Sequence, residues 1–438
     1  MEFGYKNVLI MGYGVSGQSV EVVLKKLKGV DYKIWDSGKK IIGGKYCSKL
    51  SKKFIRQFDL LIVSPGVSVY NKYIVYAEKI GIKVIGELEF GYWFTSSPVV
   101  AITGTNGKTT TTRLVNDIVG TSFKCGAFGN IGKPLSTAYN QDNEFLICEV
   151  SSFQLETTCM FKPFISVILN IAEDHLDRHK TFENYIQSKM GLIKNCTEKS
   201  MMVLNADDKI IMERTKDIKA RKYYISEFEK VKGVYVYKNK IYANLGKVEE
   251  IVCLDEIEHT YGIVQDVLAS VLVGLLLKVD KARIVNAIKS FKVSPHRIEL
   301  VESRNGIKYI DDSKSTNVHS SLHALKICKD KVILLLGGVD KKLNFESLFQ
   351  TYSEKIDQVV AFGSARKKIV ACAKKCGFDR VLSVARFSDA VNTACKLAKE
   401  SNIVLLSPGC ASFDEFTGYA QRGEEFAKIV KGYINAKV

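Results

Sequence analysis

The stretch VVAITGTNGKT, residues 99–109, joins a run of apolar, mostly β-branched residues to a glycine-rich turn and a threonine-rich segment. Val99 to Ile102 predicts a buried strand, and the residues after Lys108 are typical of a helix start. Between a strand and a helix, such a turn lets backbone N–H groups approach phosphate oxygens. The stretch therefore predicts an α/β fold built around a phosphate-binding loop.

The residue types in this turn fit a nucleotide with a divalent cation. Lys108 would reach a terminal phosphate and Thr109 would offer a hydroxyl to Mg²⁺. The turn departs from G-x-x-x-x-G-K-[ST] because Ile102 stands at the first glycine, and a G-K-T sequence also arises by chance in loops. The flanking strand and helix favour the functional interpretation. The predicted nucleotide contacts are Gly104, Thr105, Asn106, Gly107, Lys108, Thr109 and Thr110.

Short β-branched runs alternate with amphipathic stretches along the whole chain, as in parallel sheets with crossover helices. The predicted strands are Asn7 to Met11, Tyr32 to Trp35, Leu60 to Val63, Val99 to Ile102, Phe145 to Val150, Ile165 to Asn170, Lys331 to Leu336, Gln358 to Phe362 and Asn402 to Leu406. Breaks at 96–98 and 294–296 predict three domains: a Rossmann-like one over 1–95, a central P-loop ATPase over 96–296 and a C-terminal nucleotide fold over 297–438.

Composition excludes several protein classes. The 438 residues are 46% hydrophobic and 25% charged, as in an ordinary globular protein. The longest apolar stretch, Val267 to Leu277, is far too short to span a membrane, and Val8 to Met11 is cut by glycines before it forms a signal-peptide core. The eleven cysteines are scattered, which predicts buried thiols in a reducing compartment. We therefore expect a cytoplasmic protein that is not inserted in a membrane.

A net charge of +17 raises the alternative of a nucleic-acid partner. The lysines are spread along the chain, without a dense basic run interleaved with aromatic residues. A polyanionic small substrate explains a basic cleft equally well. We expect no nucleic-acid partner, and a nucleic-acid-stimulated P-loop ATPase remains a rival that DNA- or RNA-dependent turnover would reveal.

A second glycine turn, Gly12 to Gly17, follows the first predicted strand, and Asp36 closes the next one. This fits the dinucleotide fingerprint, in which glycines approach a pyrophosphate and an acid contacts a ribose hydroxyl. A nicotinamide cofactor and a nucleotide sugar satisfy the same geometry, so a dehydrogenase remains an alternative. The predicted contacts of this site are Gly14, Val15, Ser16, Asp36 and, at a neighbouring strand end, Ser64.

Two potential metal ligands follow predicted strands of the central domain. Glu149 ends the strand Phe145 to Val150, and His175 lies in the loop after Ile165 to Asn170. In an open parallel sheet, ligands bind beyond the carboxyl ends of the strands. Each side chain taken alone is more often structural, but together with the phosphate loop they predict a shared Mg²⁺-nucleotide site.

The chain resembles the Mur ligase family at this point. The resemblance rests on the phosphate loop, on Gly129 to Gly132, on Glu149 to Gln154 and on Asp174 to His179, which occur in family order. Other motifs resemble the family member that adds D-glutamate: Pro295 to Glu299, Asp312 to Asn317, Leu336 to Gly338 followed by Asp340-Lys341, and Leu405 to Asp414. The resemblance spans the chain.

The resemblance implies an enzyme with a defined reaction: ATP-dependent joining of D-glutamate to UDP-N-acetylmuramoyl-L-alanine through an acyl phosphate, in peptidoglycan precursor synthesis. It implies ATP, two Mg²⁺ ions and a monomeric chain. Nearest rivals are amide ligases with other substrates, such as a folylpolyglutamate synthase or a Mur enzyme adding another amino acid.

The resemblance also implies roles for individual residues. Catalysis would use Lys108, His175 and Lys189, and Lys189 matches a lysine that the family carbamylates. Metal ligation would involve Thr109, Glu149, His175 and Lys189. Arg297 and Asp312 would contact ATP. The implied substrate contacts, beyond the first-domain set, are Asn130, Ser152, Thr316, Lys341, Ser412 and Phe413.

Two segments depart from the family pattern. The family carries H-N-x-x-N ahead of an L-A-A helix, whereas here Gly262 to Asp266 precedes Leu268-Ala269-Ser270. An arginine that often follows the acid of the first site is replaced by Ser37-Gly38. We therefore expect the adenine side and the uracil or phosphate contacts to differ in detail from those of relatives.

Overall fold

The computed structural model describes residues 3–38, 45–340 and 343–436. Within these ranges the chain forms three β-sheets flanked by helices, mostly with parallel strands. Contacts divide the chain into two compact units. The first unit, residues 1–171, 183–258 and 263–291, holds two of these sheets; the second, residues 172–182, 259–262 and 292–438, holds the third. The predicted α/β class is confirmed.

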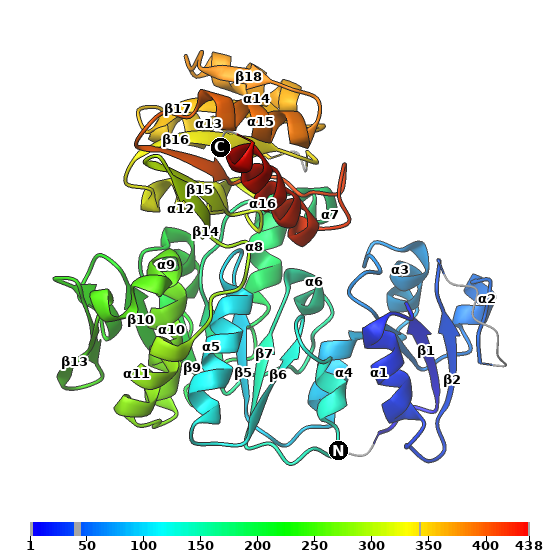
Figure 1. Ribbon diagram of the computed structural model, residues 1–438. Coiled ribbons are helices and arrows are strands. Elements are labelled where there is room, and N and C mark those ends of the chain that lie inside the picture. Colours follow the sequence, from blue (N-terminus) through cyan, green and yellow to red (C-terminus); the bar gives the residue numbers. More distant parts are fainter. Residues whose placement is uncertain (1–2, 39–44, 341–342, 437–438) are drawn as a thin grey trace. The chain divides into compact units, whose positions relative to one another are not determined.

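The first sheet is parallel, in the order β2-β1-β3-β4. Its elements are β1 (Asn7–Met11), α1 (Val15–Leu24), β2 (Asp31–Trp35), α2 (Lys52–Ile55), β3 (Leu60–Val63), α3 (Lys72–Lys79), β4 (Lys83–Gly86) and α4 (Glu87–Trp93). Successive side chains of a strand point to opposite faces. Val8 and Ile10 therefore pack in one core with α1, and Leu9 and Met11 pack in another with α2 and α3. The strands and helices of this region are drawn in blue in Figure 1.

The second sheet runs in the order β13-β12-β11-β10-β9-β8-β5-β7-β6, and only the pairs β11–β12 and β12–β13 of this series are antiparallel. Its strands are β5 (Val99–Thr103), β6 (Cys125–Gly129), β7 (Phe145–Glu149), β8 (Ile165–Ile168), β9 (Met201–Asn205), β10 (Arg221–Ser226), β11 (Gly233–Tyr237), β12 (Lys240–Asn244) and β13 (Val248–Cys253). The strand β5 lies between β7 and β8. The phosphate loop therefore starts at an interior strand.

The next helices along the chain belong to the first unit, except α7, which lies in the second unit, and α8 and η2, whose residues are divided between the two. They are α5 (Lys108–Gly120), η1 (Leu135–Ala138), α6 (Ser152–Leu155), α7 (Leu176–His179), α8 (Phe182–Met190), α9 (Lys209–Thr215), η2 (Leu254–Ile263), α10 (Val264–Leu276) and α11 (Lys281–Ser290). Helix α10 packs along α5, so the apolar stretch noted in the sequence is a buried core helix. Among the described residues, no helix combines the length and the apolar character needed to cross a bilayer.

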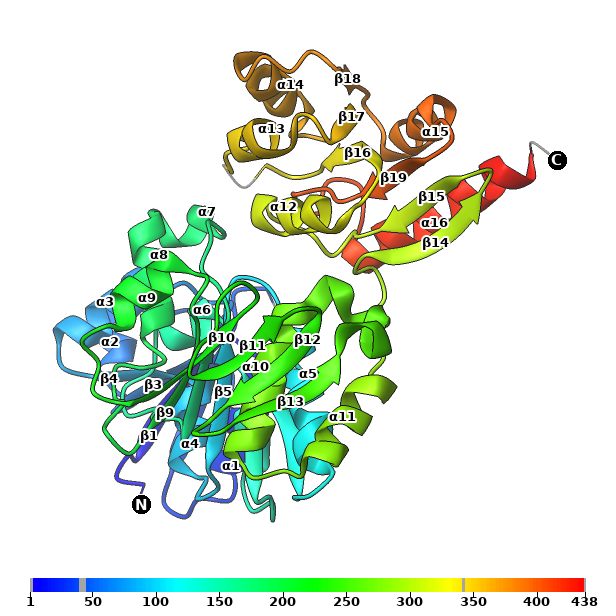
Figure 2. The same ribbon diagram turned by 90° about the vertical axis from the view of Figure 1, so that its left-hand side faces the viewer.

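The third sheet runs in the order β14-β15-β19-β16-β17-β18, with β14 antiparallel to β15. Its elements are β14 (Glu299–Arg304), β15 (Ile307–Asp311), α12 (Val318–Ile327), β16 (Lys331–Gly337), α13 (Glu346–Tyr352), β17 (Ile356–Phe362), α14 (Arg366–Lys375), β18 (Val381–Ser383), α15 (Phe387–Leu397), β19 (Asn402–Leu406) and α16 (Tyr419–Asn435). Helices α12, α13 and α14 cover one face, and α15 and α16 cover the other (Figure 2).

The cysteines are free thiols throughout the chain. Cys148, Cys328, Cys395 and Cys410 are buried, while the other seven are half-buried. The prediction of buried thiols therefore holds for four of them. Burial raises the pKa of the Cys125 and Cys328 thiols to about 11, which disfavours the reactive thiolate.

Candidate active site

The predicted phosphate loop connects the end of β5 to the first residue of α5. Gly107 has a φ of 85°, a left-handed conformation that glycine adopts without strain, and Lys108 begins the helix. The amine of Lys108 donates to the carbonyl oxygens of Gly104 and Thr105, both at 2.9 Å. The turn therefore places the N-terminal end of α5 and a lysine at one point, as binding of a phosphate requires.

A second lysine lies at the same loop. Lys189 of α8 is 1% exposed, and its Nζ donates to the carbonyl oxygen of Gly104 at 2.7 Å. Its Nζ also lies 4.7 Å from the ring centroid of Tyr185, whose hydroxyl is 3.0 Å from Thr105 Oγ1. The structure therefore brings Lys108 and Lys189 to the same carbonyl oxygen, as expected for two residues of one site.

The environment of the Glu149 carboxylate shows whether this site fits a metal ion. It ends β7 and is 1% exposed. Its Oε1 accepts from Asn130 Nδ2 at 2.7 Å, whereas its Oε2 is buried without a hydrogen-bond partner. A buried carboxylate oxygen left unpaired is costly, and a hard cation such as Mg²⁺ prefers oxygen ligands of this kind. The residues present therefore fit a bound divalent cation.

Asp266 is a residue of this site that sequence reasoning noted only as part of a departing segment. It lies in the first turn of α10, and its Oδ1 accepts from Thr111 Oγ1 at 3.2 Å. A Cβ added at Gly107 would lie 2.0 Å from the same Oδ1. The carboxylate thus abuts the phosphate loop, and an acid inside an otherwise apolar run was the signal for it.

The first-sheet turn is held by hydrogen bonds from neighbouring strand ends. Helix α1 begins after Gly14, and Val15 is 70% exposed at its start. The Asp36 carboxylate accepts from the backbone N–H groups of Tyr13 and Gly38, at 2.7 and 2.9 Å. Ser64 donates its hydroxyl to the carbonyl oxygen of Gly12 at 2.9 Å. Asp36 and Ser64 therefore shape the turn.

Ser16 and Ser152 occupy different settings in the first unit. The carbonyl oxygen of Ser16 accepts from the Ser19 hydroxyl at 2.7 Å. Ser152 begins α6 and is 4% exposed, and its carbonyl oxygen accepts from Ser188 of α8 at 2.7 Å. The bond from Ser188 ties the strand end that carries Glu149 to the helix that carries Lys189.

In the second unit, His175 adopts a left-handed conformation with a φ of 53° at the start of α7. Its backbone N–H donates to Asp174 Oδ1 at 2.8 Å, and its Nε2 lies 3.7 Å from Asp174 Oδ2. The same Oδ2 accepts from Asn317 Nδ2 at 3.2 Å. Asp174 therefore fixes the loop on which the predicted metal-site histidine stands.

Asp312 is a strongly perturbed acid of the second unit. It is 3% exposed, and its Oδ2 accepts from the hydroxyls of Ser315 and Ser407. Burial raises the pKa of Asp312 to about 7, although both hydroxyls and the positive charge of Arg297 act to lower it. The predicted pair Arg297 and Asp312 therefore interacts electrostatically.

The predicted D-glutamate contacts lie on loops after strands of the third sheet. Thr316 follows β15 and is half-buried, while Ser412 follows β19 and is 2% exposed. Phe413 is 72% exposed. Lys341 lies outside the described residues.

Sequence reasoning missed the group that joins these loops. Arg422 of α16 is fully buried and donates to Ser313 Oγ at 2.9 Å and to the carbonyl oxygens of Ser313 and Cys410. Burial lowers the pKa of this guanidinium to about 10. An arginine in an amphipathic helix carries no sequence signal of burial, so this brace could be found only in the fold.

The sheets and the phosphate loop define a nucleotide-dependent α/β enzyme, and comparison with known proteins gives its family. Residues 6–86 match the Mur ligase MurD-like N-terminal domain, residues 102–263 the Mur ligase middle domain, and residues 296–410 the Mur ligase glutamate ligase domain.

Full-length relatives agree with these matches. A protein of Thermoanaerobacter sp. (strain X514) is 38% identical over 98% of this chain and 99% of its own length. One from Clostridioides difficile (strain 630) is 34% identical over 97% and 98%. Both are named UDP-N-acetylmuramoylalanine--D-glutamate ligase. The chain belongs to the Mur ligase family.

Solved structures support the same fold. MurF ligase from Thermotoga maritima, in complex with ADP, aligns with a TM-score of 0.60 at 16% identity over 98% of this chain and 96% of that one. A pseudomurein peptide ligase type C from Methanothermus fervidus aligns with a TM-score of 0.61 at 18% identity over 97% and 100%. At such identities the likeness concerns the fold alone.

Proposed function

We propose that this protein joins D-glutamate to UDP-N-acetylmuramoyl-L-alanine at the expense of ATP, in the cytoplasm and as a monomer. The observation that carries the proposal is the similarity, over nearly the whole chain, to relatives named for this reaction. The phosphate loop with its two lysines and the unpaired Glu149 oxygen supports it from the structure.

The first unit supplies the residues that would hold ATP and Mg²⁺. Backbone N–H groups from Gly104 to Thr110 and the amine of Lys108 would bind phosphate oxygens. Glu149 and the hydroxyl of Thr109 would ligate the cation, with His175 as a further ligand. When bound, Mg²⁺ neutralises charge on the transferring phosphoryl group. Lys189 would contribute a further carboxylate to a second ion if its amine is carbamylated.

The chemistry must first activate a carboxylate, because joining it to an amine is unfavourable in water. The L-alanyl carboxylate oxygen bonds to the γ-phosphorus of ATP as the bond to ADP breaks, which gives an acyl phosphate. The neutral amine of D-glutamate then attacks the acyl carbon, phosphate departs and the amine loses a proton. Lys108 stabilises charge on the phosphoryl oxygens, and His175 assists the proton transfer.

The substrates would approach from different parts of the chain. The residues that would contact the UDP-sugar are Gly14, Val15, Ser16, Asp36 and Ser64 of the first sheet, together with Asn130 and Ser152 of the central sheet. Thr316, Lys341, Ser412 and Phe413 would bind D-glutamate, and Arg297 with Asp312 would contact ATP. The domain bounds 1–95, 96–296 and 297–438 remain our proposal, supported by family matches that begin at 6, 102 and 296.

The direct test is phosphate release measured over a panel of acceptors and amino acids. We expect turnover that requires both UDP-N-acetylmuramoyl-L-alanine and D-glutamate and that yields their amide in equal amount to phosphate. L-glutamate, L-lysine and diaminopimelate serve as amino-acid controls, and a folate acceptor tests the rival ligase class. Phosphate release independent of either substrate, or amide formation with another amino acid only, contradicts the proposal.

A further inference from the structure

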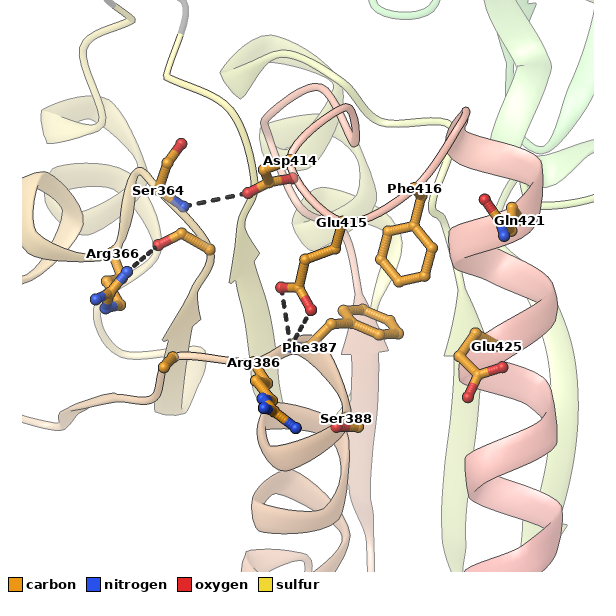
Figure 3. A pocket seen from close by; sticks show the side chains of 12 residues that line it. Ser364, Arg366, Arg386, Phe387, Ser388, Asp414, Glu415, Phe416, Gln421 and Glu425 are labelled. Atoms are coloured by element: carbon orange, nitrogen blue, oxygen red, sulfur yellow. Dashed lines mark hydrogen bonds between the residues drawn. The ribbon is translucent and has the colours of Figure 1, made fainter.

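The loop after β19 carries Ser412 and Phe413 and continues into two acidic residues, Asp414 and Glu415. Both carboxylates point away from the loop toward the starts of neighbouring helices (Figure 3). Asp414 Oδ2 accepts from the backbone N–H of Ser364 at 3.1 Å, just before α14. The two oxygens of Glu415 accept from the backbone N–H of Phe387, the first residue of α15, at 3.1 and 3.2 Å.

The contact of Glu415 meets a requirement of α15. The N-terminal N–H groups of a helix lack partners within it and carry a partial positive charge, which a carboxylate satisfies. The N-cap residues, Ala365 of α14 and Arg386 of α15, make no side-chain cap hydrogen bond. Glu415, 28 residues along the chain, therefore caps α15, whereas Asp414, 50 residues along the chain, binds the N–H of Ser364, the residue before the N-cap of α14.

The two helices leave the third sheet on opposite faces. Helix α14 packs on the face that carries α12 and α13, while α15 packs with α16 on the other. A crevice is expected where adjacent parallel strands send their connections to opposite sides, here beyond β17 and β18. A cavity of about 820 Å³ lies there, lined by Arg366, Arg386, Phe416, Gln421 and Glu425 besides the two acids.

The cavity leaves the acidic part of the loop with little packing beneath it. Asp414 and Glu415 are exposed, and Phe416 contacts Phe387 edge-on with ring centroids 5.1 Å apart. That aromatic contact anchors the end of the loop, and the backbone N–H of Phe416 donates to the carbonyl oxygen of Ser412 at 3.0 Å. The hydrogen bonds of the two carboxylates add to these contacts in orienting the segment next to Ser412. Hydrogen bonds to a charged acceptor are stronger than neutral ones.

The same contacts reach the loop that leads to Lys341. Ser364, which Asp414 holds, donates its hydroxyl to the carbonyl oxygen of Gly338 at 3.0 Å. The backbone N–H of Val339 in turn donates to the carbonyl oxygen of Ala411 at 2.8 Å. The loops after β16, β17 and β19 are therefore tied together by hydrogen bonds, to which the side chains of Asp414 and Ser364 contribute.

We propose that Asp414 and Glu415 are positioning residues of the amino-acid subsite: by binding the N–H of Ser364 ahead of α14 and by capping α15, they fix the loop that presents Ser412 and Phe413 to the γ-carboxylate or α-carboxylate of D-glutamate. The inference rests on the proposed function. Neither acid contacts the substrate; each acts through the loop. Loss of a cap therefore weakens the binding of one substrate and leaves the phosphate loop unaffected.

The test compares Glu415→Ala and Asp414→Ala with Glu415→Gln and Asp414→Asn in steady-state assays on the full chain. We expect the alanine variants to raise KM for D-glutamate about five- to tenfold, the scale of one lost hydrogen bond to a charged group. KM for ATP and kcat at saturating D-glutamate stay within about twofold of the wild type. The amide variants, which keep an acceptor oxygen, fall between.

The matched control is Glu425→Ala. It removes an acid from the same cavity, but Glu425 stands on α16 and pairs with Lys428 of that helix at 3.7 Å. We expect its KM for D-glutamate to equal that of the wild type. A control that raises this KM as much as Glu415→Ala would overturn the inference, because pocket charge rather than loop position would then be responsible.

Hydrogen–deuterium exchange provides a readout independent of activity. Amides in 409–417 are expected to exchange faster in Glu415→Ala and Asp414→Ala than in the wild type, whereas amides of α5 are unchanged. Unchanged loop exchange together with an unchanged KM for D-glutamate overturns the inference. A wild-type enzyme that ligates no D-glutamate instead refutes the proposed function, and loop exchange then still reports on the caps.

Discussion

The two carboxylate oxygens of Glu149 lie in different environments. One of its oxygens is bound by Asn130, and the other is buried without a partner. Such an arrangement stabilises nothing in the free protein, since an unpaired buried oxygen costs folding free energy. It is understandable as the preformed half of a metal site.

Glu149→Gln tests this interpretation. Replacing the carboxylate removes the charge that a cation needs, so we expect kcat to fall about a hundredfold, within the range seen for catalytic groups, and the Mg²⁺ concentration for half-maximal activity to rise. The melting temperature should stay the same or increase. Asp142→Asn, which removes an exposed acid after the same domain's η1, serves as the control. Unchanged Mg²⁺ dependence in Glu149→Gln would contradict a metal at this position.

The burial of Lys189 could not be predicted from the sequence. Motifs pointed to Lys108, Glu149 and Lys189, and the structure brings Lys108 and Lys189 to the carbonyl oxygen of Gly104. No pattern in the sequence indicated that Lys189 is buried, because a lysine on an amphipathic helix is ordinarily solvated. Asp266 and Arg422 were missed because their partners, Thr111 and Ser313, are far away along the chain.

Lys189→Ala gives a second test at the residue scale. Without the amine the proposed carbamate cannot form, so we expect activity to fall below about one percent. Added formate or acetate, whose carboxylate fits the space left by the side chain, should restore part of it. Methylammonium, which replaces the amine instead, is the control. Rescue by methylammonium but not by the carboxylates would mean that the positive charge is what matters.

At the scale of elements, α4 is held in place by a buried carboxylate that accepts four hydrogen bonds. Glu89 is fully buried, and its carboxylate accepts from the backbone N–H groups of Cys159, Met160 and Phe161 and from Trp93 Nε1. The helix that closes the first sheet is thereby fastened to the segment after α6. These bonds lie between the two sheets of the first unit, so they join its halves.

Glu89→Ala should therefore destabilise the first unit strongly. It leaves buried donors without an acceptor, each costing about 1–3 kcal/mol, and we expect a loss of at least about 3 kcal/mol in the free energy of unfolding. Urea unfolding followed by tryptophan fluorescence measures it. Glu78→Ala, an exposed acid of α3, is the control. A loss below about 1 kcal/mol would show that the carboxylate is not needed for this junction.

Among the elements, apolar sequence patterns predicted some strands and missed others. Every predicted strand exists, and these strands were found because they are continuous apolar runs. The strands β4, β6, β9, β10 to β15 and β18 were not predicted. Several of them have partly exposed side chains and mixed sequences, such as Val-Glu-Glu-Ile-Val-Cys in β13, although β9 is fully buried. Antiparallel ribbons at a sheet edge give a weaker signal than buried parallel strands.

For the molecule as a whole, Asp312 links stability to pH. Its pKa rises from 3.8 to about 7 because the carboxyl is buried, so folding favours the protonated form. A raised folded-state pKa contributes stability that is fully present below the unfolded value, near 4, and is lost as pH rises through about 7.

Asp312→Asn removes this titration while keeping the size of the side chain. Between pH 4 and 7 we expect wild-type stability to fall relative to the variant by about 1.4 kcal/mol per pH unit. Melting curves of both proteins at several pH values, taken for the second unit's transition, measure the difference. A constant difference in melting temperature across this range would show that Asp312 is ionised in the folded chain.

The central claim is that the loop from Thr103 to Thr109 binds the triphosphate of ATP beside a cation held by Glu149. A crystal structure with Mg²⁺ and a non-hydrolysable ATP analogue tests it most directly. The account predicts phosphate oxygens within hydrogen-bond distance of the backbone N–H groups of this loop and of Lys108 Nζ, with Glu149 Oε2 directed at the metal. A nucleotide bound elsewhere, with this loop empty, would contradict it.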